Sequence, residues 1–315
     1  MHPAVKRRSF LKWFSASAMT LPFTAYGISR ASYKYFDQDI YLFSKHLQWL
    51  DCKNAARTAK EIGFDGLDLT VRPKGHVLPE NVERDLPKAI NAIRKAGMKV
   101  EVITTAITGA EEQYTEAILK IASQLEIKSY RLGWLKYDAE TSIDKQLENY
   151  RKRLATLAKM NEHYQIRGDY QNHAGTSVGS AVWDIWYLLK DIDPKWMGCR
   201  YDIRHAVAEG FKSGKVNLRL LKEHIQSLDI KDYTYVQENG QWTIQHTPLG
   251  KGAVDFEDYF KTLKELNISK PLTLHTEYEL GGANKGKYEL SIPAEQVISA
   301  LTTDLNYLQK AMNKH

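Results

Sequence analysis

The stretch Met197-Gly-Cys-Arg-Tyr-Asp-Ile-Arg-His205 decides how the rest of the chain is interpreted. Residues 198–203 form a short segment of strand length after Pro194, and such a segment is typical of a buried strand. It ends in Asp202 and His205, a carboxylate and an imidazole three residues apart. If the chain bends there into a loop or helical turn, both side chains can point into one cleft. Oxygen and imidazole groups of this kind suit a divalent metal.

Three other predicted strands end in similar polar residues. They are Gln171-Asn-His173, Asp229-Ile-Lys231-Asp232 and His275-Thr-Glu277-Tyr-Glu279. In a closed parallel barrel, the C-terminal ends of the strands form one face, and that face carries the active site. The sequence therefore predicts one site built from several strand ends.

The whole chain alternates between strand and helix patterns. Eight such units with short connections predict a single (β/α)8 TIM barrel, and no internal boundary indicates a second domain. The predicted strands are residues 39–43, 66–71, 99–104, 129–134, 165–171, 198–203, 224–231 and 272–276. The predicted helices are residues 53–62, 81–96, 111–125, 142–163, 181–189, 218–223, 256–266 and 294–312.

One long insertion, residues 233–254, follows the seventh strand. It contains Glu238-Asn-Gly-Gln241, a hairpin turn signal, between strand-like residues 233–236 and 242–244. Because it comes directly after Lys231, it is expected to border the site, either as a lid or as a surface hairpin.

Charge and cysteine content exclude some classes. The 315 residues carry a net charge of +6, but five of the 44 Lys and Arg and none of the 38 Asp and Glu lie in residues 1–30. The rest of the chain is nearly neutral, which argues against nucleic acid as a partner. Cys52 and Cys199 stand alone within predicted elements, so we expect two free thiols and no disulfide framework.

The N-terminus predicts export. Residues 6–12, Lys-Arg-Arg-Ser-Phe-Leu-Lys, resemble the twin-arginine motif, and a moderately apolar stretch and small residues follow. We expect a signal peptide over residues 1–30, a barrel over residues 31–315 and a periplasmic location. No later segment is long and apolar enough for stable membrane insertion. Replacing Arg7 and Arg8 by lysine is expected to leave the protein in the cytoplasm.

Four motifs together resemble the xylose isomerase-like barrel family, the sugar isomerase/epimerase superfamily. Residues 61–69 are similar to its "elGfdGvdL" stretch, residues 172–175 to "ENHGG" and residues 201–206 to "DxxHa". Residues 230–232 followed by 248–256 are similar to "KD…PLGeGvvDf". Each motif alone is weak, but the ordered set covers residues 38–312.

The resemblance implies a divalent metal held at the ends of strands five to eight. The family commonly uses Glu, Asp, His and Glu there, and the matching positions are Gln171, Asp202, Asp229 and Glu277. Gln171 and Asp229 depart from the pattern. An oxygen-rich shell favours Mg²⁺ or Mn²⁺ over zinc, unless His173 or His205 restores a nitrogen ligand.

The resemblance also implies proton transfer beside a carbonyl. Gln171 cannot take a proton at neutral pH. Glu277 is therefore expected to serve one face of the substrate, and His173, His205 or Lys231 the other. Candidate substrate-binding side chains follow the first and second strands, His46, Trp49, Arg72 and His76, and one, Arg131, lies within the fourth strand.

The expected function is a metal-dependent carbohydrate isomerase or epimerase with an enediolate intermediate. One alternative is a lyase that cleaves keto-glycosides by β-elimination, which needs one base and one acid. Another is a non-catalytic sugar-binding barrel. Abasic-site DNA repair is disfavoured because its metal ligands and a basic groove cannot be placed. The expected partner is a small-molecule carbohydrate, and the oligomeric state is left open.

Overall fold

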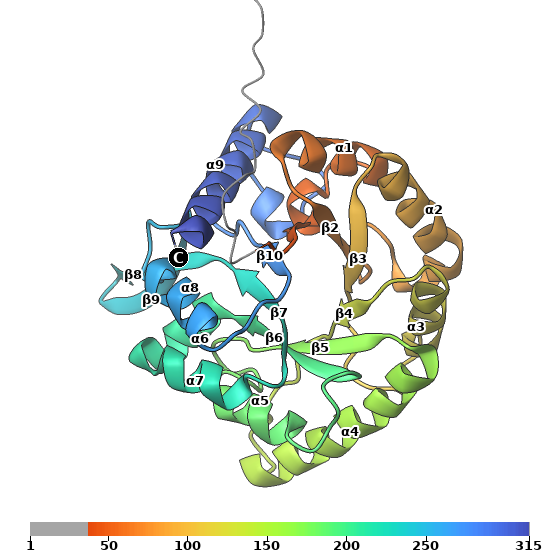
Figure 1. Ribbon diagram of the computed structural model, residues 1–315, viewed down its shortest axis with the longest axis vertical. Helices are drawn as coiled ribbons and strands as arrows, with labels where there is room; N and C mark the ends of the chain where they lie inside the picture. Colours follow the sequence, from red (N-terminus) through yellow and green to blue (C-terminus); the bar gives the residue numbers. More distant parts are fainter. Residues whose placement is uncertain (1–36, 315) are drawn as a thin grey trace, which may run out of the picture. The chain divides into compact units, whose positions relative to one another are not determined.

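A computed structural model describes residues 37–314. In that part of the chain, eight parallel strands close into a barrel in the order β1-β10-β7-β6-β5-β4-β3-β2, with helices around the outside (Figure 1). This confirms the predicted (β/α)8 barrel. The predicted signal peptide lies outside the described residues. Among the described residues, no helix has the length and apolar character that crossing a membrane requires.

The barrel strands are short and mostly buried, as parallel strands covered by helices must be. Every neighbouring pair in the ring is parallel. Strand ends from distant parts of the sequence therefore meet on one face. The strands are β1 Ile40–Phe43, β2 Gly66–Thr70, β3 Lys99–Thr104, β4 Ser129–Arg131, β5 Arg167–Gln171, β6 Met197–Asp202, β7 Ile225–Ile230 and β10 Leu272–Leu274.

The outer helices are amphipathic and bury one stripe against the barrel. In α1, for example, the Asp51 side chain caps the first turn, and Gly63 ends the helix in a left-handed conformation. The helices are α1 Cys52–Ile62, α2 Val82–Lys95, α3 Thr115–Gln124, α4 Ile143–Tyr164, α5 Val182–Leu189, α6 Ile203–Gly210, α7 Gly214–Leu221, α8 Phe256–Glu265 and α9 Ala294–Asn313.

The segment after β6 differs from the prediction. The sequence predicted one short helix, residues 218–223, but the structure has α6 directly after the strand and then α7. The cause is Asp202, whose side chain accepts a hydrogen bond from the backbone N–H of His205 and so caps α6. The cap places His205 on the first turn of a helix at the barrel mouth.

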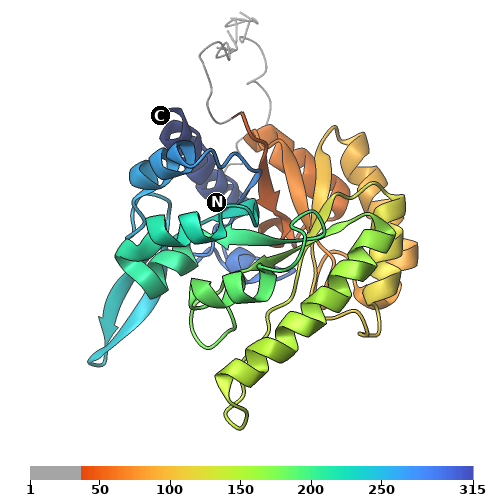
Figure 2. The ribbon, with the colours of Figure 1, turned by 60° about the horizontal axis from the view of Figure 1, so that its bottom comes forward.

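The predicted hairpin is present as β8 Asp232–Glu238 and β9 Gln241–Thr247, which pair antiparallel. Its turn residues Asn239 and Gly240 both have positive φ angles, 51° and 80°, as a tight type I′ turn requires. Figure 2 shows the hairpin projecting away from the barrel.

Candidate active site

A buried arginine lies at the centre of the polar network inside the barrel. Arg200 on β6 places its Nη2 2.7 Å from Asp68 Oδ2 on β2, and its Nε donates to Asp229 Oδ1 on β7 at 2.6 Å. His275 Nε2 lies 3.3 Å from the same Asp229 oxygen. Burial raises the pKa of Asp229, but Arg200 and His275 outweigh it and the net shift is downward. One guanidinium therefore contacts two buried carboxylates and offsets the charge of one of them.

Gln171, at the end of β5, connects this network to Asp202. Its Oε1 accepts from Arg131 Nη1 at 3.3 Å. Its Nε2 donates to Asp202 Oδ2 at 2.8 Å and to Asp229 Oδ2 at 2.6 Å. These contacts fix the amide orientation, because the opposite orientation would place its oxygen against two carboxylates. The amide thus acts as a donor between Asp202 and Asp229.

Two lysines hold Glu277, which follows β10. Lys231 Nζ lies 3.0 Å from Asp202 Oδ2 and 3.4 Å from Glu277 Oε2, and Lys45 Nζ lies 2.8 Å from Glu277 Oε1. Burial lowers the pKa of Lys231, but Asp202 and Glu277 outweigh it, so the pKa is raised. Burial raises the pKa of Glu277, yet Lys231 and Lys45 bring it well below its usual range. These shifts keep Lys231 and Glu277 charged at neutral pH. Burial lowers the pKa of Lys45, and Glu277 only partly opposes that shift.

Two stacked histidines, His173 and His205, complete the group, with ring centres 4.1 Å apart. His205 Nδ1 accepts from the Ala174 N–H at 3.1 Å and lies 2.7 Å from Arg204 Nη1, also a donor. Its proton is therefore on Nε2, which lies 3.6 Å from Asp202 Oδ2. His173 Nδ1 lies 2.9 Å from the Ala174 carbonyl oxygen, so Nδ1 holds the proton and Nε2 keeps a free lone pair. Burial lowers the pKa of both rings, which keeps them neutral.

Three of the predicted substrate-binding residues are engaged in holding loops. His46 is fully buried, and its Nε2 accepts from the Thr276 N–H at 3.0 Å. Trp49 Nε1 donates to the His46 carbonyl oxygen at 3.2 Å. His76 Nδ1 lies 3.1 Å from Thr70 Oγ1, and burial lowers the pKa of His76 to about 4. These contacts favour loop packing over substrate contact.

Arg72 and Arg131 lie closer to the polar network. The guanidinium of Arg72 is half-buried, 5.4 Å from the ring centre of Phe43. That of Arg131 is buried, 4.4 Å from the ring centre of Trp134. Arg72 also lines a cavity of about 840 Å³ with Lys45, so it remains a candidate substrate contact.

The hairpin reaches the site through its base. His246 on β9 places Nε2 3.9 Å from Glu277 Oε2. Asp232, the first residue of β8, accepts the backbone N–H groups of Gly250, Gly252 and Val254 and so holds the loop that follows the hairpin. The expectation that the hairpin borders the site is confirmed for its base.

The four predicted metal ligands meet at the barrel mouth, but their contacts do not fit a divalent cation. Each carboxylate is already paired with Lys45, Arg200 or Lys231, and the amide oxygen of Gln171 faces Arg131. A hard cation needs several free oxygen ligands. Within residues 37–314, no group of three or more His, Cys, Asp and Glu side chains is arranged to hold a metal.

The sequence predictions named His275 among the polar strand ends but did not include Lys45, Asp68 and Arg200 as members of the site. Asp68 and Arg200 are 132 positions apart, and only the closure of the barrel brings them together. Lys45 could have been predicted from the sequence, because it directly precedes His46 in the segment that follows the first strand, where site residues were expected.

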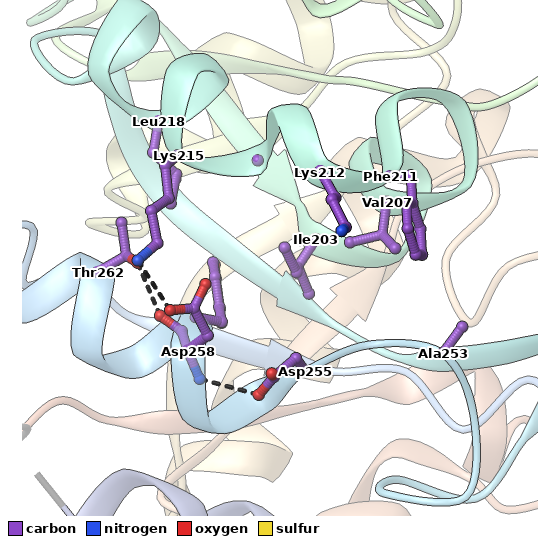
Figure 3. A pocket seen from close by; sticks show the side chains of 12 residues that line it. Ile203, Val207, Phe211, Lys212, Lys215, Leu218, Ala253, Asp255, Asp258 and Thr262 are labelled. Carbon is purple, nitrogen blue, oxygen red and sulfur yellow. Dashed lines mark hydrogen bonds and ion pairs between the residues drawn. The ribbon is translucent and has the colours of Figure 1, made fainter.

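A second cavity, of about 450 Å³, lies in the outer layer between α6, α7 and α8 (Figure 3). Ile203 and Leu218 supply apolar lining, and Lys215 Nζ forms an ion pair with Asp258 Oδ1 at 2.8 Å. Asp255 caps α8 by accepting from the Asp258 N–H. None of the predicted site residues lines this cavity.

Comparisons with known proteins agree with this geometry. The family model described as "Xylose isomerase-like TIM barrel" matches residues 56–297, so the chain belongs to the xylose isomerase-like TIM barrel family.

Among curated relatives, an uncharacterised protein of Methanocaldococcus jannaschii is 24% identical over 61% of each chain, so this chain spans about six tenths of that relative. Inosose dehydratase of Bacillus velezensis is 23% identical over 72% of this chain and 82% of its own.

Two solved structures share the fold. The 3-keto-D-glucoside 4-epimerase of E. coli has a TM-score of 0.63 at 15% identity, covering 87% of this chain and 99% of its own. A xylose isomerase-like protein from Mycobacterium smegmatis, solved with magnesium, has a TM-score of 0.62 at 13% identity, covering 90% and 99%. At these identities the likeness establishes the fold.

Proposed function

We propose that the protein is a carbohydrate lyase or dehydratase that removes a proton beside a carbonyl and expels a group from the next carbon. One observation carries this proposal: two neutral histidines with opposite tautomers lie beside an ammonium that two carboxylates hold. His173 offers a lone pair to accept a proton, and His205 and Lys231 offer hydrogen-bond donors. The names of an epimerase and a dehydratase among the similar proteins support the class of reaction.

The proposed steps use one base. His173 Nε2 takes the proton from the carbon beside the carbonyl, and the electron pair of that C–H bond forms a C=C bond to the carbonyl carbon. The resulting enolate oxygen accepts hydrogen bonds from the Lys231 ammonium and the His205 Nε2–H. The enolate then re-forms the carbonyl, and the electron pair of its C=C bond forms a new C=C bond between the deprotonated carbon and the next carbon along the chain. The C–O bond on that next carbon breaks at the same time. The imidazolium of His173 returns its proton to the departing oxygen, which leaves as an alcohol or water.

In this proposal, positive side chains supply the charge that the sequence assigned to a metal. Lys231 and Lys45 lie at the barrel mouth against Asp202 and Glu277. A fixed ammonium in a buried site stabilises a developing enolate without a metal ligand set. The predicted Mg²⁺ or Mn²⁺ dependence stays a prediction that the paired carboxylates do not favour.

Epimerisation is the second candidate, because the ring order places Glu277 and His173 apart. The end of β10 carries Glu277 and the end of β5 carries His173, with β7 and β6 between them. Two groups so placed can serve opposite faces of a substrate lying over Lys231. However, both Glu277 oxygens contact lysines, and its lowered pKa makes it a weak base. That favours elimination.

The test compares a 3-keto-glycoside with the free ketoses tagatose and fructose, followed by NMR in D₂O. Release of the aglycone with an unsaturated ketone supports the lyase, and interconversion of ketoses supports the epimerase. Replacing His173 by Asn is expected to lower turnover at least a hundredfold. The control is His163→Asn, an exposed histidine on α4. Undiminished turnover in His173→Asn would refute the assignment, and no turnover of any substrate would favour a non-catalytic sugar-binding barrel.

A further inference from the structure

The charges at the barrel mouth are unbalanced in favour of cations. Four buried or half-buried carboxylates, on Asp68, Asp202, Asp229 and Glu277, form ion pairs with three cations, Lys45, Arg200 and Lys231. The excess of cations comes from three arginines outside these pairs. Three further guanidinium groups, of Arg72, Arg131 and Arg204, have no carboxylate at ion-pair distance within residues 37–314.

The unpaired arginines are costly in this position. Arg131 is 2% exposed and Arg204 5% exposed. Their hydrogen-bond partners are neutral: Gln171 and Thr105 for Arg131, and the His205 ring for Arg204. Burying a positive charge without a carboxylate at ion-pair distance opposes folding, so the excess of positive charge at the barrel mouth favours an added anion there.

A cavity of about 840 Å³ extends outward from the inner cations. Its inner lining includes Lys45 and Arg72, and its outer lining includes Lys74, Lys285 and Lys287. Glu289 is the one carboxylate among its lining residues. The loops after β1, β2 and β10 therefore form a basic wall that begins at the contact between Lys45 and Glu277.

The pKa shifts of Arg72 and Arg131 also indicate an excess of positive charge near the barrel interior. Desolvation lowers the pKa of Arg72, and Asp68 and Glu277 only partly oppose it. Desolvation also lowers the pKa of Arg131, and the charges of Arg72 and Arg200 lower it further. An anionic group placed beside Arg72 would relieve this repulsion, because it brings the missing negative charge.

We propose that the substrate is an anionic carbohydrate whose negatively charged group binds between Arg72 and Lys45, with the outer lysines attracting it into the cavity. This inference rests on the proposed function only in assuming that a carbohydrate enters the barrel mouth. A carboxylate suits the planar fork of Arg72, and a phosphate or sulfate shares the same chemistry.

The test is calorimetric binding, which needs no turnover. Glucuronate, glucose 6-phosphate and glucose 6-sulfate are titrated against glucose at low and moderate salt. At least one anionic sugar is expected to bind ten times more tightly than glucose, with a preference that weakens as salt rises. The tightest of the three identifies the anion. Equal binding of glucose and all three anionic sugars would overturn the proposal.

Variants locate the anion. Arg72→Gln is expected to remove most of the preference over glucose, and the double variant Lys74→Gln/Lys287→Gln to weaken it two- to fourfold. Lys120→Gln, on the exposed side of α3, is the charge-matched control and should leave it unchanged. A preference that survives in Arg72→Gln would also overturn the proposal. Turnover of neutral keto-glycosides is measured in parallel. The binding results then test the anion site, and the turnover results test the proposed reaction class independently.

Discussion

In the proposed reaction, the tautomers of His173 and His205 determine which ring accepts a proton and which donates a hydrogen bond. Burial lowers the pKa of His173 below its ordinary 6.5, and Lys231 lowers it further. The base form is therefore present throughout the neutral range and is lost only as the pH falls through the lowered pKa. The Lys231 pKa lies above its ordinary 10.5, so the ammonium persists well into the alkaline range.

These pKa directions predict the pH profile of turnover. The value of kcat/KM should stay level between about pH 6.5 and pH 9 and fall on the acid side below pH 6.5, where His173 becomes protonated. The measurement is kcat/KM from pH 4.5 to 10 in buffers of constant ionic strength. An acid limb centred above pH 6.5 would show that another group is the base.

Gln171 is the single position that separates this site from a carboxylate-rich metal site. Replacing Gln171 by Glu puts a third carboxylate against Asp202 and Asp229, which lie 2.8 and 2.6 Å from its Nε2. Without metal, the variant should be destabilised by about 2–4 kcal/mol, because two donated hydrogen bonds become repulsion. With Mn²⁺ or Mg²⁺ the loss should shrink, since the added charge favours a cation.

Thermal melts with chelator and with added metal measure both effects. The wild type should show the same melting temperature with chelator and with millimolar Mg²⁺ or Mn²⁺. Gln124→Glu, at an exposed position on α3, controls for the added charge. A wild-type melting temperature that rises by several degrees with metal would restore the sequence-based expectation of a divalent cation.

At the scale of elements, Asp202 connects the end of β6 to the start of α6. Its Oδ1 accepts the His205 N–H at 3.1 Å, while its Oδ2 contacts Lys231 and Gln171. The sequence allowed a helical turn here, but the helical prediction was placed later. Asp202 acts both as a helix cap and as an ion-pair partner of Lys231, which directly follows β7. A local sequence pattern around Asp202 contains no information about that second contact.

The hairpin gives a prediction that belongs to this scale. Its base contacts the site through His246, while the hairpin projects away from the barrel in Figure 2. Replacing His246 by Ala should weaken substrate binding about three- to tenfold, since it removes a side chain beside Glu277. Removing the outer part of the hairpin and rejoining the strands through an Asn-Gly turn should leave affinity within twofold. Calorimetry measures the substrate affinity of both variants, and thermal melts measure their stability. A loss of affinity in the shortened variant would show that the tip of the hairpin acts as a lid.

For the whole molecule, strand and helix alternation was enough to predict the barrel, since each unit is a local pattern. The positions of Gln171, Asp202, Asp229 and Glu277 at one mouth followed from parallel strand order. The ion pairs of these residues could not be predicted in the same way. Arg200 lies within a buried strand, and its carboxylate partners are on strands that only the closed barrel brings next to it. Charge balance inside a barrel is a property of the assembled ring.

The buried histidines make the stability of the whole barrel sensitive to mild acid. Burial lowers the pKa of His46 and of His205 well below 6.5, and that of His76 to about 4. The unfolded chain binds these protons first as the pH falls below 6.5, so unfolding becomes easier as the pH decreases towards the folded-state values. The lowered pKa values of Asp229 and Glu277 act in the same direction, but only below about pH 4.5.

The expected loss between pH 7 and pH 5 comes from histidine: the His76 ring, with a pKa of about 4, contributes up to roughly 2 kcal/mol, because one pKa unit corresponds to about 1.4 kcal/mol. For a chain of this length, each kcal/mol lowers the melting temperature by about 2 °C, so His76 alone predicts a fall of up to about 4 °C. His46 and His205 act in the same direction, and Asp304, whose pKa burial raises to about 6, acts in the opposite one. His76→Gln should reduce the slope of melting temperature against pH even if it lowers stability at pH 7. His163→Gln, exposed on α4, should keep the wild-type slope. A wild-type melting temperature that stays constant from pH 7 to pH 5 would contradict the lowered pKa values of the buried histidines.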